Sequence, residues 1–553
     1  MFSPRIHRYI FLFGTITLVS SLPLSPFLVS LSQFLLGINW LLENETDFGA
    51  SQSRQRRGFQ FYFRSIGNNI TIKIKRLLNR KGLLLILSIY LVHVIWLINS
   101  THFVYGLHDL KIKLPIFTLP LIFGTSLPLT KKEQRYIFHF YLLSAAVALL
   151  ISTAILLGLT PVKVIDIRDI SPFISHIRLS LIIVLAFYFA LYYLLFDPAE
   201  MMFPRYVYYT LILLYLSFTV LIGATTGLVV LLLVFPIAVL YLLKQKQNGR
   251  YIMAGITVLF LITGLSLAYL IHCYFRFMNR EPLVPASLPT VTVNGNKYRN
   301  ILNEKEYENK YLVWVEVCDK ELSREWEKRS KIPYNGRDLK NQTVKITLIR
   351  YLTSLGYTKD SAGCAKLSDE DISMIEKGAT NYIFKNKWAL YPRFYQIFWE
   401  IEHYLRGENP GGHSITQRIE YLKNSIHVIR RNFWFGTGTG DTDYEIMQQY
   451  IIDNSKLNLH WRNRAHNQLI TFLLTFGIFG FAWILLAVAF ALRYERKNID
   501  FIFLCFFLIF LFSTINEDTL ETQIGATFYA LFLSLLLFAR DSPGKKRNTE
   551  NIT

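Results

Sequence analysis

Residues 465–491 read AHNQLITFLLTFGIFGFAWILLAVAFA and contain no Asp, Glu, Lys or Arg. A helix needs roughly 20 apolar residues to cross the ~30 Å hydrocarbon core of a bilayer, and this stretch is long enough. Similar blocks recur along the 553-residue chain, which is 52% hydrophobic, 15% aromatic and only 18% charged. The pattern predicts an all-α polytopic membrane protein and argues against a disordered chain or a soluble nucleic-acid-binding protein.

The apolar blocks predict about twelve membrane-spanning helices. They lie near residues 9–22, 25–42, 82–99, 114–130, 136–159, 179–196, 206–222, 224–243, 251–273, 465–491, 499–515 and 524–539. The first block follows Arg5 and Arg8, as the apolar core of a signal peptide would. No cleavage site of the A-x-A type follows it, so we expect a retained first span.

The distribution of basic residues predicts the orientation in the membrane. With a cytoplasmic N-terminus, the inner segments are 1–8, 43–81, 131–135, 197–205, 244–250, 492–498 and 540–553. Counting Asp500, these segments hold 25 basic and 10 acidic residues, which is most of the net charge of +20. The last outer loop is instead acidic, with Glu517, Asp518 and Glu521. The positive-inside rule therefore predicts that both termini are cytoplasmic and that residues 274–462 are exported.

This orientation divides the chain into four predicted parts. Residues 1–273 carry spans 1–9, residues 274–462 form a large, mostly helical exported domain, residues 463–540 carry spans 10–12, and residues 541–553 form a cytoplasmic tail. Within the exported domain we expect a strand at Tyr311–Val317 and helices at 320–330, 342–355, 369–385, 391–406, 415–431 and 443–453. Ser368 and Asp371 suggest a capping box, and Gly407 suggests a helix end.

Other chemical signatures are few. Of the four cysteines, Cys318 and Cys364 lie well inside the exported domain, where they could form a disulfide or remain free. No C-x-x-C motif or His/Cys cluster indicates a metal site, and no Walker or dinucleotide-binding motif is found. We therefore expect neither a metal nor a nucleotide cofactor.

Arg178 stands where an outer loop enters a predicted span, in Ser175-His-Ile-Arg-Leu-Ser180. An arginine at this depth is costly unless it is paired or hydrated. It could snorkel or pair with Asp166 or Asp169, or it could bind an anion, because the guanidinium fork matches phosphate oxygens. The residues alone leave both interpretations open.

His466 opens the tenth predicted span from the outer side. The positive end of a helix dipole disfavours imidazolium, so a neutral histidine at a helix start could serve as a general base for a hydroxyl nucleophile. A capping or interfacial role is the more common one for a single histidine. Asn467 follows it directly.

Arg418 lies on a predicted amphipathic helix, in Gly412-His-Ser-Ile-Thr-Gln-Arg-Ile-Glu420, and would ordinarily be a solvated side chain. The same helix leads to the turn Gly436-Thr-Gly-Thr-Gly440. Backbone N–H groups of such a turn could hold a phosphate, although tight folding of the chain back toward the membrane is the simpler reason for the glycines.

Taken together, the segment from Arg418 to Gly480 resembles the C-terminal signature of the bacterial O-antigen ligase and O-antigen polymerase superfamily. The signature combines an arginine-bearing helix, a Gly-x-Gly-x-Gly turn, His-Asn-x-x-(Leu/Ile) at the start of a span, and Gly-Ile-x-Gly within it. This chain supplies Arg418, Gly436–Gly440, His466–Ile470 and Gly477–Gly480. Pro23–Ser25, Lys113–Pro115 and Arg178 also fit the general pattern of the family.

The resemblance implies a GT-C-like membrane glycosyltransferase of the bacterial inner membrane, acting in lipopolysaccharide biosynthesis with its exported domain in the periplasm. The implied donor is a glycan on undecaprenyl pyrophosphate, and the implied acceptor is a hydroxyl of lipid A-core or a similar glycolipid. Carried over to this sequence, Arg178 and Arg418 hold the pyrophosphate and His466 activates the acceptor, without a metal or other cofactor. The further substrate-binding residues are Gly438, Gly440, Asn467 and His413.

Alternatives remain open at this stage. A polymerase or a protein O-oligosaccharyltransferase would use the same donor with another acceptor, and residues 281–390 carry no motif that selects among them. A transporter of lipid-linked glycans is less favoured, because the sequence has no internal repeat and its spans contain almost no charge; His93 and His139 are polar exceptions. A receptor or scaffold is favoured least.

Overall fold

The computed structural model describes residues 3–43, 59–162, 170–221, 225–245, 249–282, 288–386 and 389–540. It is about 71% helical, and its one sheet in the described residues has two strands. The chain divides into two compact units: unit 1 comprises Met1–Ile256 and Gln417–Thr553, and unit 2 comprises Thr257–Thr416. The helical class predicted from the apolar blocks is therefore confirmed.

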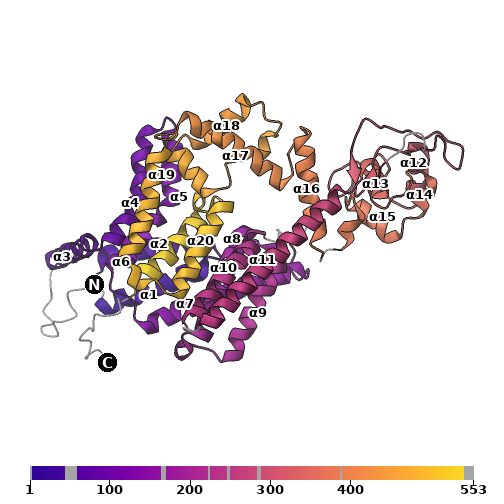
Figure 1. The fold of residues 1–553 in the computed structure, drawn as a ribbon. Coiled ribbons are helices and arrows are strands. Elements are labelled where there is room, and N and C mark those ends of the chain that lie inside the picture. Colours follow the sequence, from indigo (N-terminus) through magenta and orange to yellow (C-terminus); the bar gives the residue numbers. More distant parts are fainter. Residues whose placement is uncertain are drawn as a thin grey trace. The chain divides into compact units, whose positions relative to one another are not determined.

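Unit 1 is a bundle of apolar helices (Figure 1). In chain order its helices are α1 (Pro4–Ser21), α2 (Pro26–Leu42), α3 (Phe59–Leu78), α4 (Lys81–Ile95), α5 (Phe103–Lys113), α6 (Pro115–Thr125), α7 (Lys131–Leu156), α8 (His176–Leu195), α9 (Arg205–Leu221), α10 (Thr225–Gln245), α18 (Thr442–Ile452), α19 (Gln468–Tyr494), α20 (Phe501–Asn516) and α21 (Gln523–Leu533). Helix α11 (Gly249–Met278) leads from unit 1 into unit 2, and α17 (Ser414–Arg431) leads back.

Short polar caps set the ends of several of these helices. Thr130 and Glu133 form a capping box at the start of α7, and the side chains of Ser175, Asn467 and Asp500 cap α8, α19 and α20. Each cap satisfies a backbone N–H that the helix itself leaves without a partner. The packing places α4 against α19, α6 against α21, and α10 against α8 and α20.

The length and composition of the observed helices can be compared with the twelve predicted membrane spans. Each of the twelve predicted blocks coincides with a helix, and five of the described helices are long and apolar enough to cross a membrane. They are Lys81–Asn99, Lys131–Leu156, His176–Leu195, Ile256–Met278 and Gln468–Tyr494, and four shorter apolar helices accompany them. The chain is thus a multi-pass membrane protein, and the count of twelve spans stays a prediction.

Unit 2 is a small helical domain with its own core. It contains α12 (Asp319–Glu327), α13 (Val344–Ser354), α14 (Ser361–Ala365), α15 (Asp369–Glu376) and α16 (Tyr391–Leu405), beside the antiparallel strands β1 (Tyr307–Glu308) and β2 (Tyr311–Leu312). Trp326 and Tyr351 are fully buried in the core of α12, α13 and α15.

Several local predictions for unit 2 can be assessed. The Ser368–Asp371 capping box is confirmed, and Gly407, with φ +82°, follows the end of α16 as expected. The expected strand Tyr311–Val317 is shorter, and the helix expected at 369–385 stops at Glu376, because Gly378 adopts φ +77°. The left-handed conformation at Gly378 interrupts the regular helical backbone that the residue pattern suggested.

The cysteines and two of the histidines have structural roles. All four cysteines are buried and free, so Cys318 and Cys364 form no disulfide. His93 and His139 are also buried: the Nδ1 of His93 lies 2.9 Å from the carbonyl of Ile89, and the Nε2 of His139 lies 2.5 Å from the hydroxyl of Tyr208. These partners are typical of helix packing and not of an ion pathway.

Candidate active site

The acidic segment between α20 and α21, residues 517–522, brings together most of the polar side chains that concern function. Its carboxylates point to different partners: Glu517 to Arg418, Asp518 to Thr471, and Glu521 to a buried lysine and an arginine. All of these residues belong to unit 1. The segment is thus held through three carboxylates. Its position determines where Glu517 meets Arg418.

Arg418 is held by the end of α20. Its Nη2 donates to Oε1 of Glu517 at 3.1 Å, and its Nη1 donates to the side-chain carbonyl of Asn516. The amide of Asn516 donates in turn to the hydroxyl of Thr226 on α10, at 2.8 Å. The Arg418 side chain is still 33% exposed, so the guanidinium is positioned by the protein and accessible to an anion.

His466 lies beside the same carboxylate. Its Nδ1 is 3.7 Å from Oε2 of Glu517, and its ring packs against Tyr421 with centroids 5.5 Å apart. Tyr421 is anchored because its hydroxyl donates to the carbonyl of Trp461 at 2.7 Å. The imidazole is 38% exposed, so it has a defined orientation and an open face.

The backbone at His466 differs from the expectation of a helix start. Helix α19 begins at Gln468, and His466 lies just outside it with φ +48°, in the left-handed region that non-glycine residues rarely adopt. Asn467 is the cap: its Oδ1 accepts from the N–H of Ile470, and its Nδ2 donates to the carbonyl of Ile515. These bonds link α19 to α20 and place His466 next to Glu517.

Arg178 lies in the first turn of α8. Its Nη1 donates to the Ser175 hydroxyl at 3.2 Å, while its Nε is buried and has no hydrogen-bond partner among the described residues. The side chain lines a small cavity together with Thr519, Ile524 and other residues of α8 and α21. Glu517 also attracts Arg178 electrostatically. The alternative partners Asp166 and Asp169 lie outside the described residues.

Arg418 and His466 therefore share one neighbour, Glu517, and the charge of Glu517 also acts on Arg178. Two guanidinium groups and an imidazole thus lie within the electrostatic reach of one carboxylate. Such a site can bind a phosphate group through the arginines, and the imidazole can accept a proton from a hydroxyl.

The glycine-rich turn packs against the chain after α4. Gly438 has φ +89°, and a Cβ there would lie 2.4 Å from the carbonyl oxygen of Asn99. At Gly440 a Cβ would lie 2.5 Å from the carbonyl oxygen of His102. The backbone N–H groups of all five residues from Gly436 to Gly440 donate to acceptors within the protein. This arrangement favours tight folding of the chain over a phosphate cradle.

Asp441, directly after the turn, fixes it to the start of α5. Its carboxylate accepts from the backbone N–H groups of Thr101 and His102, at 2.7 and 2.8 Å. Burial raises the pKa of Asp441, but these hydrogen bonds outweigh it and hold the pKa below its usual value. The turn is thereby held by an ionised side chain.

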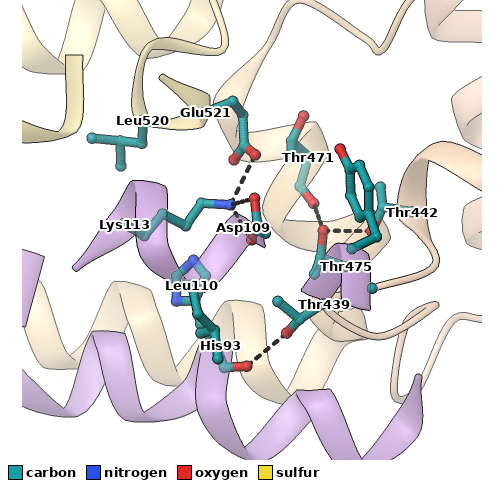
Figure 2. A network of polar contacts seen from close by, with 12 residues as sticks. His93, Asp109, Leu110, Lys113, Thr439, Thr442, Thr471, Thr475, Leu520 and Glu521 are labelled. Carbon is teal, nitrogen blue, oxygen red and sulfur yellow. Dashed lines mark hydrogen bonds and ion pairs between the residues drawn. The ribbon is translucent and has the colours of Figure 1, made fainter. Parts of the chain in front are cut away.

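Figure 2 shows a second polar network, in which Glu521 of the acidic segment and Asp109 contact Lys113. Lys113 is buried and its Nζ lies 2.6 Å from Asp109 and 2.8 Å from Glu521. Glu521 also accepts from Arg464 and, at 2.9 Å, from Gln468. Burial disfavours both charges, but their mutual attraction keeps the pKa of Glu521 below and that of Lys113 above the ordinary value. This network anchors the segment that carries Glu517.

His413, the remaining predicted substrate-binding residue, belongs to unit 2. Its Nδ1 lies 3.8 Å from the Glu400 carboxylate, and its ring contacts that of Trp399. Among the described residues, no group of three or more His, Cys, Asp and Glu side chains is arranged to hold a metal ion.

Sequence reasoning missed Glu517 as a site residue and used the acidic loop only to orient the chain. A signal was present, because carboxylates at the outer ends of apolar spans need cationic partners. The sequence does not show which cations those are.

Comparison with known families agrees with the resemblance drawn from the sequence motifs. Residues 388–485 match the family model described as O-Antigen ligase, a segment that includes Arg418, the glycine-rich turn and His466. This match supports the O-antigen ligase and polymerase superfamily, whose members are glycosyltransferase-like ligases or polymerases. No curated protein matches the chain significantly.

Proposed function

From its O-antigen ligase domain, we propose that this protein transfers a glycan from undecaprenyl pyrophosphate to an acceptor hydroxyl of lipid A-core or a similar glycolipid. The single observation that carries the proposal is the shared contact of Arg418 and His466 with Glu517, whose charge also acts on Arg178. These residues come from segments far apart in the chain. They combine anion binding with a proton acceptor, which this reaction requires.

In the proposed reaction, Arg178 and Arg418 bind the pyrophosphate. Negative charge grows on this leaving group as the glycosidic C–O bond breaks, and fixed guanidinium groups stabilise it in the transition state. This is the role that a divalent cation has in many other transferases, and we therefore propose that the reaction is metal-independent.

His466 acts on the other reactant. It accepts the proton of the acceptor hydroxyl, whose oxygen attacks the anomeric carbon from the face opposite the pyrophosphate. A single displacement of this kind inverts the anomeric centre. The exposed fraction of the imidazole, 38%, leaves room for the approach of an acceptor.

The setting that we propose is the bacterial inner membrane, with both termini cytoplasmic and residues 274–462 in the periplasm. The support is the excess of basic residues in the predicted inner segments. The lipid-linked donor would then reach Arg178 and Arg418 laterally, from the outer leaflet.

Two other acceptors remain candidates: a second glycan repeat, for a polymerase, and an exported protein, for an O-oligosaccharyltransferase. The phenotype of a deletion strain distinguishes the first from a ligase. Loss of a ligase leaves long lipid-linked polymer unattached, whereas loss of a polymerase leaves single repeats attached.

The direct test is transfer by the purified protein in detergent or nanodiscs, from a polyprenyl-pyrophosphate-linked glycan to separately supplied glycolipid, glycan and protein acceptors. We expect product with one acceptor class, also in the presence of EDTA. His466→Ala is expected to abolish transfer and to leave expression and donor binding largely intact. The matched control is His460→Ala, which removes an exposed histidine six residues earlier.

The outcomes separate the parts of the proposal. Undiminished transfer by His466→Ala would contradict the role of the base, and loss of transfer with EDTA would contradict the metal-independent mechanism. Movement of an intact lipid-linked glycan across the membrane, without transfer to any acceptor, would support a transporter instead.

A further inference from the structure

We infer that Glu517 is a positioning residue with two functions: it orients His466 for proton abstraction, and it occupies the phosphate-binding guanidinium of Arg418 until the donor arrives. This inference rests on the proposed function and adds a residue that the sequence motifs do not contain. Glu517 is the first residue after α20, 51 positions from His466 and 99 from Arg418.

The first function follows from the nitrogen that faces the carboxylate. A carboxylate only accepts hydrogen bonds, and a neutral imidazole carries one N–H. Because Nδ1 of His466 faces Oε2 of Glu517, the proton belongs on Nδ1 and the lone pair on Nε2. Nε2 is therefore the nitrogen that accepts the proton of the acceptor hydroxyl.

The second function follows from the other carboxylate oxygen. Oε1 of Glu517 accepts from Nη2 of Arg418 at 3.1 Å, the geometry that a phosphate oxygen would adopt. At 3.7 Å the contact with His466 is longer than a hydrogen bond, since the same carboxylate is held by Arg418. Donor pyrophosphate competes for Arg418, and a displaced Glu517 needs to move by less than about 1 Å to hydrogen-bond His466.

Among the described residues, the titratable groups near His466 come from the acidic segment, from α17 and from the residues just before α19. Glu517 and Asp518 face it from the acidic segment, Tyr421 from α17, and Arg418 is linked to it through Glu517. Arg464 precedes it by two residues, but its guanidinium is engaged with Glu521, Asp443 and Tyr105. Glu517 is therefore the carboxylate best placed to stabilise a protonated His466.

The transfer step balances with these groups alone. The acceptor O–H proton moves to Nε2 of His466 as the O–C1 bond forms. The bond between C1 and the phosphate oxygen breaks, and its electron pair leaves with the pyrophosphate on Arg178 and Arg418. Imidazolium, stabilised through Nδ1–H by Glu517, then returns the proton to water.

The test compares Glu517→Gln, Glu517→Asp and the wild-type protein over a range of pH, with the polyprenyl-pyrophosphate donor varied. Glu517→Gln keeps the size of the side chain but removes its charge. We expect kcat to fall about tenfold or more, and the acid limb of kcat/KM to move down by on the order of one pH unit. The limb moves because imidazolium loses its stabilising neighbour.

The donor dependence provides the second readout. The KM for donor should stay equal or fall in Glu517→Gln, because pyrophosphate no longer competes with a carboxylate for Arg418. Glu517→Asp should restore part of the kcat. Glu445→Gln on α18, which removes a carboxylate that faces Arg431 on α17, is the control and should resemble the wild type.

Three results would contradict the inference. They are an unchanged acid limb in Glu517→Gln, a raised donor KM together with a lowered melting temperature, and no rescue by Glu517→Asp. A purely structural role would produce the last two. If the wild-type protein itself transfers no glycan to any acceptor, the proposed function fails as well, and the two failures are therefore distinguishable.

Discussion

At the scale of single residues, the two arginines of the site differ in how they are held. Arg418 is fixed by Glu517 and Asn516, whereas Arg178, within the part of the chain that the structure describes, bonds only its own cap residue Ser175 and has a buried, unpartnered Nε. An unpaired buried donor is costly, which is consistent with a ligand that completes its bonding. Both residues present a planar fork that a lysine lacks.

Arg178→Lys and Arg418→Lys are therefore expected to be far from conservative. Each retains the positive charge but loses bidentate contact with the leaving group, so kcat should fall by about 100-fold. Donor binding should weaken as well, in a filter or thermophoresis assay with labelled lipid pyrophosphate. Arg430→Lys, an exposed position on α17, serves as the control. Near-normal transfer by both site variants would exclude pyrophosphate binding by these side chains.

At the scale of elements, the glycine-rich turn and α19 depend on each other. Helix α19 is interrupted at Gly477, with φ 60° and ψ −169°, and the N–H of Ile478 donates to the carbonyl of Phe433 just before the turn. A Cβ at Gly477 would lie 2.5 Å from the backbone nitrogen of Gly436. The interruption therefore makes room for the turn within the helix that begins two residues after His466.

Gly477→Ala and Gly438→Ala should both destabilise the protein. A left-handed conformation costs a residue with a Cβ roughly 1–2 kcal/mol, and the close backbone contacts add to that. We expect a lower melting temperature in detergent and reduced transfer. Gly37→Ala, in α2, has open space around the added methyl and should be neutral. A melting temperature of Gly477→Ala equal to that of Gly37→Ala would contradict the packing described.

The ion cluster that anchors the acidic segment gives a second prediction at this scale. Lys113→Met leaves Asp109 without its buried cation and leaves Glu521 with Arg464 alone, and removing one partner of a buried pair costs roughly 3–5 kcal/mol. The double variant Lys113→Met/Asp109→Asn, which also removes the carboxylate left unpaired, should recover part of the loss. Equal thermal stability of Lys113→Met and the wild type would show that the cluster contributes nothing.

The same cluster predicts a dependence of stability on pH. The lowered pKa of Glu521 means that its contribution is complete above about pH 4.5 and is lost on acidification below that value. The raised pKa of Lys113 means that its contribution is complete below about pH 10.5 and is lost in stronger base. Unfolding followed by intrinsic fluorescence should thus show a plateau between these limits, and Lys113→Met/Glu521→Gln should flatten its acid edge.

At the scale of the whole molecule, the orientation in the membrane is the main prediction. The four native cysteines are buried, and burial raises the pKa of the Cys364 thiol to about 11, so introduced cysteines can be labelled against a low background. In intact spheroplasts, a membrane-impermeant maleimide should label Lys328→Cys and should leave Lys132→Cys unlabelled until the cells are lysed. The opposite pattern would reverse the proposed topology.

Features set by residues close together in the chain could be predicted from the sequence, whereas features set by residues far apart in the chain could not. The apolar helices, the Ser368–Asp371 cap and the stop at Gly407 are local and were predicted correctly, whereas the count of membrane spans stays a prediction. Glu517 was not assigned to the site, because its partners lie 51 and 99 residues away and only the packed helices bring them together. The interruption of α19 was missed for a similar reason, since its cause is a turn about 40 residues earlier in the chain.

The division of the chain into two units has an evolutionary consequence. Arg178, Arg418, His466 and Glu517 all belong to unit 1, and the chain leaves that unit after Ile256 and returns at Gln417. Insertions or deletions within Thr257–Thr416 change the number of residues between Arg178 and Arg418 and leave the spacing of Arg418, His466 and Glu517 untouched. The length of unit 2 can therefore change without altering the spacing of the residues proposed for the chemistry within unit 1.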